Sequence, residues 1–241
     1  MIGLSLGLWQ NRPSFSPLSL SPALWFDASD SATLFQSNGG AAASADGDPV
    51  GYWLDKSGNG RHLTQTSGIN KPLLKLAIKN GKNGVLFNGT SSFFNMANYT
   101  HGSSITCFRV FQRTASGQRN FTFTNSSYED IPFAWEPNNK PYVGNGTVSF
   151  VATSANTNTG YFISRSSYTS TSDLACWLNN VAVSGSISGT PSSAKPWFKY
   201  CNVAALYSPG NVLEEIVFPS ALSAGDIDKM NNYLNSKWAV Y

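Results

Sequence analysis

Residues 127–142 hold the side chains best suited to bind a sugar. The stretch interleaves aromatic rings with carboxylates and amides. Sugar recognition needs an aromatic face for the apolar side of the pyranose ring and planar polar groups for its hydroxyls. The candidate carbohydrate-binding residues are Tyr128, Asp130, Trp135, Asn138, Asn139 and Tyr142. For Trp135 there is an alternative, because Phe133 lies two positions away and both rings can face the core of one strand.

A second candidate chemistry is calcium binding. Five of the 13 acidic residues lie in the first third of the chain, and carboxylate oxygens in turns are ligands that Ca²⁺ prefers. The candidate ligands are Asp27, Asp30, Asp46 and Asp48. The segment Asp46-Gly47-Asp48 also suits an ordinary turn in which Asp bonds its own backbone, and we favour this interpretation. No other cofactor is indicated.

Catalytic patterns are absent from the sequence. Glycan hydrolysis needs two carboxylates that face one cleft, whereas Glu214 and Glu215 are adjacent and neighbours in a strand point to opposite faces. The two histidines, His62 and His101, lie far apart, and no nucleophile elbow, phosphate loop or zinc-protease motif accompanies them. The sequence therefore predicts a protein that is not an enzyme.

The composition narrows the class of protein further. Charged residues make up 12% of the chain and aromatic residues 13%, and the charged share is about half the usual one. The net charge is +3 with scattered basic residues, which argues against a nucleic-acid partner. The three cysteines, Cys107, Cys176 and Cys201, lack metal-ligand spacing and lie in apolar runs, so we expect buried thiols.

The elements that must position these residues are strands. Short apolar runs recur between Gly, Asn and Ser turns from residue 23 onward, as in residues 105–111 and 174–178. One helix is expected, at the C-terminus, where Ser223 is a suitable N-cap and an apolar stripe runs from Ile227 to Trp238. This pattern predicts an all-β protein with a short C-terminal helix docked on it.

The first 22 residues differ from the rest of the chain. They are rich in Gly and Ser and contain Pro13, Pro17 and Pro22, so we expect an extended N-terminal arm over residues 1–22 and one domain over 23–241. The arm's apolar residues either pack on its own domain or dock on a partner. The candidate docking residues are Leu4, Leu6, Leu8 and Trp9. Neither a signal peptide nor a membrane span is expected.

Five segments occur in an order that resembles the laminin-G-like, concanavalin-A-like lectin/glucanase superfamily. They are ALWFDASD at 23–30, WLDKSGNGRHL at 53–63, GVLFNGTSSFF at 84–94, WLNNVAV at 177–183, and EIVFPSALS at 215–223 leading into the helix that ends NSKW at 238. The second is the most specific, because Asp55 can accept backbone N–H bonds from the turn that follows it. In the fourth, Asn180 replaces the usual Gly but tolerates the left-handed conformation.

The resemblance implies a two-sheet antiparallel jelly-roll sandwich that recognises carbohydrate or surface proteins. With the arm, it suggests a bacteriophage virion surface protein, assembled in the host cytoplasm. We expect it to be homo-oligomeric, to bind a host-surface glycan, and to contact other virion structural proteins through the arm. The alternative is a purely structural capsid-decoration or fibre protein that makes protein–protein contacts. A third, weaker hypothesis is a glycan hydrolase.

Overall fold

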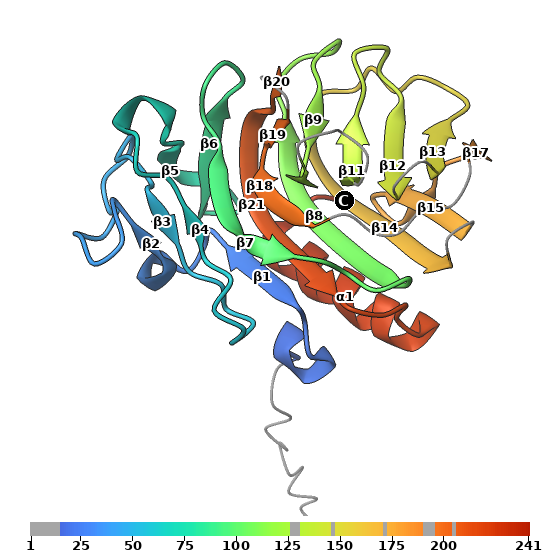
Figure 1. Ribbon diagram of the computed structural model, residues 1–241, viewed down its shortest axis with the longest axis horizontal. Helices are drawn as coiled ribbons and strands as arrows, with labels where there is room; N and C mark the ends of the chain where they lie inside the picture. Colours follow the sequence, from blue (N-terminus) through green and yellow to red (C-terminus); the bar gives the residue numbers. More distant parts are fainter. Residues whose placement is uncertain (1–14, 126–130, 146–147, 171–172, 190–195, 204–205) are drawn as a thin grey trace, which may run out of the picture.

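The computed structural model describes residues 15–125, 131–145, 148–170, 173–189, 196–203 and 206–241. The described strands form two packed layers of antiparallel sheet, and an α-helix lies on the outside of one layer (Figure 1). The predicted all-β sandwich with a C-terminal helix is therefore confirmed.

The first layer is one sheet in the order β16-β15-β14-β8-β21-β6-β5, and β1 also pairs with β21. Its strands are β1 (Leu24–Asp27), β5 (Leu73–Lys79), β6 (Lys82–Asn88), β8 (Ile105–Arg113), β14 (Gly160–Ser170), β15 (Asp173–Leu178), β16 (Val181–Ala182) and β21 (Pro209–Phe218). The long strands β8, β14 and β21 lie side by side at its centre (Figure 1). Both faces of β8 are buried, as the apolar side chains on both faces of the predicted strand indicate.

The second layer consists of two smaller sheets and a hairpin. One sheet runs β10-β18-β7-β4-β3-β2 and the other β17-β13-β12-β11-β9, while β19 pairs with β20. The first comprises β2 (Leu34–Phe35), β3 (Tyr52–Trp53), β4 (Leu63–Thr64), β7 (Phe94–Tyr99), β10 (Phe123–Thr124) and β18 (Trp197–Tyr200). The second comprises β9 (Asn120–Phe121), β11 (Ile131–Trp135), β12 (Pro141–Asn145), β13 (Val148–Ala152) and β17 (Gly185–Ser188). The hairpin strands are β19 (Asn202–Val203) and β20 (Leu206–Tyr207).

An aromatic core fills the space between the layers. Trp53, Trp135, Trp197, Phe26 and Phe94 are each completely buried there. Aromatic ring pairs give this core specific geometry as well as apolar area. In one such pair, Phe123 and Trp197, the ring centroids are 5.4 Å apart and the ring planes are nearly parallel. All three cysteines are buried, as predicted, and none of them forms a disulfide bond.

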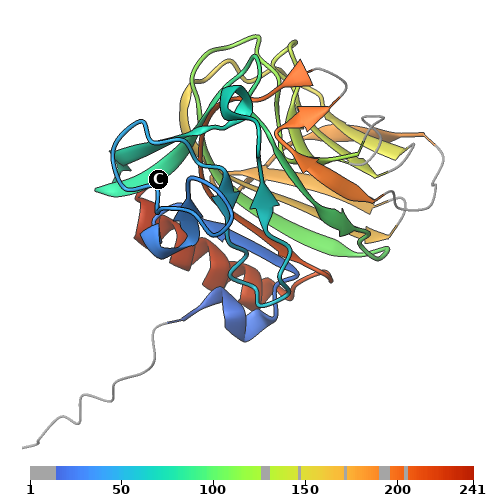
Figure 2. The same ribbon diagram turned by 60° about the vertical axis from the view of Figure 1, so that its left-hand side comes forward.

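The helix α1 (Ala224–Trp238) packs on the outer face of the first sheet (Figure 2). The side chain of Ser223 accepts a hydrogen bond from the Asp226 N–H at 3.2 Å, which confirms the predicted N-cap. Met230, Leu234 and Trp238 are fully buried against the sheet. Because a 15-residue helix is marginal alone, this contact stabilises it.

Residues 15–22 lie against the same outer cluster. Pro17–Leu20 form the 3₁₀ helix η1, and the Phe15 ring meets Tyr233 of α1 edge to face with centroids 6.0 Å apart. Two further 3₁₀ turns are η2 (Ser31–Thr33) and η3 (Gly68–Asn70). The candidate docking residues Leu4, Leu6, Leu8 and Trp9 lie outside the described residues, so the extent and role of the arm stay predictions.

Candidate functional site

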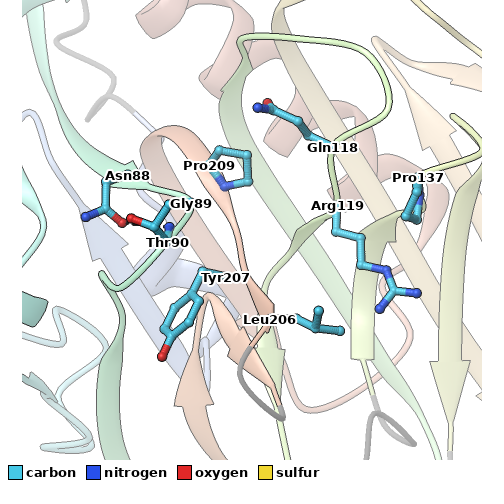
Figure 3. Close-up of a pocket in the computed structure, with 9 residues that line it drawn as sticks. All are labelled: Asn88, Gly89, Thr90, Gln118, Arg119, Pro137, Leu206, Tyr207 and Pro209. Carbon is cyan, nitrogen blue, oxygen red and sulfur yellow. Dashed lines mark hydrogen bonds between the residues drawn. The ribbon is translucent and has the colours of Figure 1, made fainter.

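A pocket of about 740 Å³ opens at one end of the sandwich, where loops from both layers meet. Figure 3 shows the 88–90 turn on one side, residues 118, 119 and 137 on the other, and residues 206 and 207 between them. Its lining residues are Asn88, Gly89, Thr90, Gln118, Arg119, Pro137, Leu206, Tyr207 and Pro209.

The first wall is the turn between β6 and β7. The Asn88 side-chain oxygen accepts hydrogen bonds from the backbone N–H groups of Thr90, Ser91 and Ser92 at 2.9–3.0 Å. Gly89 has a φ of +74°, and a Cβ on it would come within 2.8 Å of Pro209. This glycine therefore permits both the turn and its close approach to β21, and the wall is rigidly held.

The opposite wall is the loop before β9, which carries Gln118 and Arg119. The Arg119 Nε lies 3.3 Å from a carboxylate oxygen of Glu136 in the β11–β12 turn. The next residue, Asn120, donates its side-chain N–H to the Pro209 carbonyl at 2.6 Å. These contacts tie the loop to β21 and to the neighbouring turn, so the guanidinium is held at the pocket.

The base between the walls is the hairpin β19–β20. Tyr207 is half-buried, and its ring centroid lies 6.2 Å from that of Phe93. Leu206 is 37% exposed, and its carbonyl accepts a hydrogen bond from the Asn202 side chain at 3.0 Å. An aromatic ring and an apolar side chain therefore face the pocket from an anchored hairpin.

The lining combines one aromatic ring, the side-chain amide of Gln118 and the guanidinium of Arg119. A ring offers its face to the apolar side of a pyranose, while the amide and guanidinium donate hydrogen bonds to hydroxyl oxygens. Among the described lining residues, Arg119 is a cationic side chain, and it is paired with Glu136. The described lining thus offers groups that suit sugar recognition.

The predicted aromatic candidate Trp135 does not line this pocket. It is completely buried beneath Phe111 and Phe162, with ring centroids 6.3 and 5.2 Å away. The Arg113 guanidinium lies 4.4 Å from the Trp135 ring on another side. Trp135 therefore has no face for a ligand, and its assignment to the sugar site is corrected in favour of the core alternative, which Phe133 shares.

The other predicted sugar-binding residues are dispersed. Tyr128 and Asp130 lie outside the described residues. Asn138 is exposed and accepts a hydrogen bond from the Lys140 N–H, while the half-buried Tyr142 ring lies beside Gly144. Neither lines the pocket.

Asn139 is a support for the pocket wall. Its side-chain oxygen accepts a hydrogen bond from the Gly117 N–H at 2.7 Å and another from the Arg113 guanidinium. It occupies a left-handed conformation, with φ +65°, that Asn tolerates. By holding Gly117, it fixes the loop that carries Gln118 and Arg119.

The four candidate calcium ligands do not converge. Asp27 is buried between Lys56 and Lys237, at 3.0 and 2.7 Å, and these cations hold the pKa of its carboxyl low despite its burial. Asp30 lies 2.7 Å from Lys56, and Asp46 pairs with Lys75. In contrast, Asp48 accepts the Ser44 and Ala45 N–H groups. Across the described ranges no cluster of three metal-ligating side chains occurs.

The remaining candidates for chemistry lie away from the pocket. His101 is buried beside Trp197, and the His62 Nδ1 accepts the Asp55 N–H at 3.0 Å. Glu214 faces α1 and Glu215 faces the interior, which confirms that the two adjacent acids point to opposite sides of β21.

Sequence reasoning did not find the pocket. Its walls come from three segments that are far apart in the sequence, residues 88–90, 118–119 and 206–209. The pairing of β6 with β21 and the hydrogen bond from Asn120 to the Pro209 carbonyl help to bring them together. The available local signals were the Asn88-Gly89 turn and Tyr207 directly before Ser208-Pro209, next to a predicted strand end.

Comparison with known proteins gives a likeness of fold. No family model and no curated protein matches the sequence. The binding domain of Paraclostridial Mosquitocidal Protein 1 matches with a TM-score of 0.54 and 10% identity, over 76% of this chain and 49% of that one. Domain 4 of a GH43 extracellular arabinanase from Geobacillus stearothermophilus, in complex with arabinotriose, matches with a TM-score of 0.52 and 11% identity, over 73% of this chain and 91% of that one.

These likenesses support a jelly-roll β-sandwich fold, whereas membership of the laminin-G-like, concanavalin-A-like superfamily stays a prediction. Within the described residues, no helix combines the length and apolarity needed to cross a membrane.

One sequence prediction is corrected by the comparisons. A Trypanosoma rangeli sialidase in complex with the inhibitor DANA matches with a TM-score of 0.50 and 10% identity, over 80% of this chain. This match corrects the prediction of a non-enzymatic protein, because part of an enzyme's chain has a similar fold. The match spans 34% of the sialidase chain, about a third of its length, and is a likeness of fold that assigns no reaction.

Proposed function

We propose that this protein binds carbohydrate through the pocket between the 88–90 turn, the β8–β9 loop and β20. The observation that carries the proposal is that Tyr207, Gln118 and Arg119 line one pocket whose walls are anchored. The arabinotriose complex of the arabinanase domain, whose length is 91% matched, supports the class of ligand. Stacking on one ring with a few exposed hydrogen bonds gives an affinity on the order of 0.1–1 mM for one site.

A glycan array probed with multimerised protein tests this proposal. Tyr207→Ala removes the stacking face and should weaken binding by about tenfold, equivalent to about 1.4 kcal/mol. Tyr241→Ala is the matched control, because Tyr241 is 49% exposed and lies outside the pocket. Equal melting temperatures of the two variants exclude unfolding as the cause. Analysis of the supernatant for released sugars decides whether a bound glycan is also cleaved.

If the wild-type protein binds no glycan on the array, the proposal is contradicted. This result would favour the structural alternative, in which the protein contacts its own copies or neighbouring subunits. Binding that survives both Tyr207→Ala and Gln118→Ala would keep the function but place its site elsewhere.

The biological setting stays a proposal of its own. We propose a location on a virion surface, with the apolar residues Leu4, Leu6, Leu8 and Trp9 docked on neighbouring virion proteins. The resemblance of the five sequence segments and the composition of the arm support it. Labelling purified particles with antibodies to this chain tests the location. A chain that lacks residues 1–14 should fold but fail to join the particle, and its normal incorporation would contradict the docking role.

A further inference from the structure

A second hollow, of about 390 Å³, lies at the other end of β21 from the pocket described above. Pro219, directly after β21, lines this hollow, whereas Pro209, the first residue of β21, lines the pocket. Four described segments meet there: the residues before β1, the turn after β3, the end of β7 and the end of β21. The described lining residues are Leu18, Ser21, Pro22, Ala23, Ser57, Asn59, Arg61, Tyr99 and Pro219.

Tyr99 is a buried lining residue with an unused polar group. It is 7% exposed, its ring centroid lies 5.6 Å from that of Trp197, and the Arg61 guanidinium lies over the ring at 4.9 Å. Its hydroxyl forms no hydrogen bond with any residue that the structure describes. Burial raises the pKa of Tyr99 to about 12, so the hydroxyl stays protonated at neutral pH and can donate. The hydroxyl is therefore left for a group that enters the hollow.

Arg61 brings a positive charge to the same wall. Its backbone N–H donates to the Asp55 carboxylate at 3.1 Å, and one guanidinium N–H donates to the Ala23 carbonyl at 3.1 Å. Among the carboxylates that the structure describes, none forms an ion pair with this guanidinium. Because a guanidinium has several N–H donors, its other donors stay available to a ligand.

Two further polar residues hold the walls together. The Asn59 side-chain N–H group donates to the carbonyls of Pro22 and Ala23 at 3.1 Å. The Ser57 hydroxyl donates to the Asp55 carboxylate at 2.8 Å. These bonds join the turn after β3 to the residues before β1, so the hollow has an anchored wall.

The unused donors and the apolar surface beside them indicate the class of ligand. The two oxygens of one carboxylate can accept from the Arg61 guanidinium and the Tyr99 hydroxyl together, and the charge strengthens these bonds. Leu18, which is 50% exposed, and the rings of Pro22 and Pro219 supply apolar surface in the same lining. We infer that this hollow binds a small carboxylic acid, whose carboxylate meets Arg61 and Tyr99 and whose apolar part contacts Leu18 and Pro219. The site is separate from the sugar pocket and does not depend on the proposed function.

An NMR titration of the ¹⁵N-labelled full chain with N-acetyl-leucine and N-acetyl-leucinamide tests this inference. The two probes share an apolar body and differ in that one carries a carboxylate and the other a neutral amide. The acid should bind about tenfold more tightly than the amide, the effect of one charge-assisted contact. Raising NaCl from about 0.05 to 0.5 M should reduce this preference, because salt screens the charge.

Substitutions assign the effect to the two side chains. Tyr99→Phe removes only the hydroxyl and should weaken binding of the acid about threefold, the effect of one hydrogen bond, without lowering the melting temperature. Arg61→Gln should abolish the preference for the acid over the amide, whereas Arg61→Lys should retain part of it. Lys229→Gln is the matched control, since it removes one positive charge from the exposed side of α1. The comparison of the two probes with wild-type protein needs no variant, so a misfolded variant would not prevent the test.

The outcomes that would overturn the inference are distinct from those for the sugar pocket. Equal binding of the acid and the amide by the wild-type protein, or binding of neither, would overturn it and leave the proposed function intact. Tighter binding of inorganic sulfate than of N-acetyl-leucine would overturn the assignment to a carboxylate with an apolar body. Binding of the acid that survives both Tyr99→Phe and Arg61→Gln unchanged would overturn the location.

Discussion

Asp55 organises the turn that carries the most specific of the sequence motifs. Its carboxylate accepts backbone N–H groups from Trp25 at 3.0 Å, Ser57 at 2.9 Å and Arg61 at 3.1 Å. The predicted role of Asp55 as an acceptor for the turn amides is therefore confirmed. Because Trp25 belongs to β1, the same side chain also joins the turn to the first sheet.

Loss of the Asp55 carboxylate should destabilise the fold. We expect Asp55→Ala to lower the free energy of unfolding by about 1–3 kcal/mol, because buried N–H donors lose their acceptor. Urea denaturation measures the change. Asp228→Ala serves as the control, since Asp228 is exposed on α1, and equal stability of the two variants would contradict this role.

Glu215 is an acid in the interior of the sandwich. It is fully buried, accepts the Tyr200 hydroxyl at 2.9 Å, and lies 3.4 Å from the Arg109 Nε. Burial raises its pKa from 4.5 to about 7, while Arg109 opposes the rise. The folded state therefore holds the Glu215 proton more tightly than the unfolded chain does.

This difference predicts a dependence of stability on pH. Between pH 4.5 and about 7 the unfolded chain ionises Glu215 while the folded state retains the proton. Stability should therefore fall as pH rises through this window, at about 1.4 kcal/mol per pH unit from this group. Unfolding of wild type and Glu215→Gln in parallel isolates the contribution, because Gln does not titrate. Identical pH profiles for the two proteins would contradict the raised pKa.

At the scale of elements, α1 is fastened to the sheet by a buried carboxylate. Glu214 accepts hydrogen bonds from the indole N–H groups of Trp25 at 2.9 Å and Trp238 at 2.6 Å, and from the Tyr233 hydroxyl at 2.9 Å. The Lys237 Nζ lies 2.9 Å away and balances its charge. Three residues of the helix thus converge on one residue of β21.

Removal of this acceptor should loosen the helix from the sheet. Glu214→Ala removes the carboxylate that two indole N–H groups and the Lys237 ammonium contact. We expect the free energy of unfolding to fall by about 3–5 kcal/mol, as for other broken buried ion pairs. Lys229→Ala is a suitable control, because it breaks the exposed pair with Asp226 and should cost less than about 1 kcal/mol. Thermal unfolding followed by tryptophan fluorescence compares them, and a Glu214→Ala loss no larger than the control would contradict the role.

Elements with a local signal could be predicted from the sequence. The apolar runs at 105–111 and 174–178 predict β8 and β15, and the apolar stripe with its Ser223 cap predicts α1, because burial period and capping are local properties. Asn180, with a φ of +61°, adopts the left-handed conformation expected of it. Two-residue strands such as β2 and β4 were not predicted, because their pairing partners, and not their own residues, define them.

At the scale of the whole molecule, the pocket follows from topology. Trp135 was among the site candidates because aromatic residues suit both cores and sugar sites, and sequence does not separate these uses before burial is known. Tyr207 lines the pocket because its hairpin lies between the loops of the two layers. The sequence therefore shows which residue types suit sugar binding. Which of these residues lie together in one pocket is known only from the fold.

The junction between the first residues and the domain supplies the last prediction. Phe15 packs on Tyr233, Leu20 joins the same outer cluster, and the Pro22 carbonyl accepts a hydrogen bond from Asn59 at 3.1 Å. A chain that begins at residue 23 should therefore lose about 2 kcal/mol of stability through lost apolar burial. A chain that begins at residue 15 keeps all these contacts and should unfold like the full chain. Calorimetry on the three chains decides, and equal melting temperatures for all three would mean that residues 15–22 contribute nothing to the folded domain.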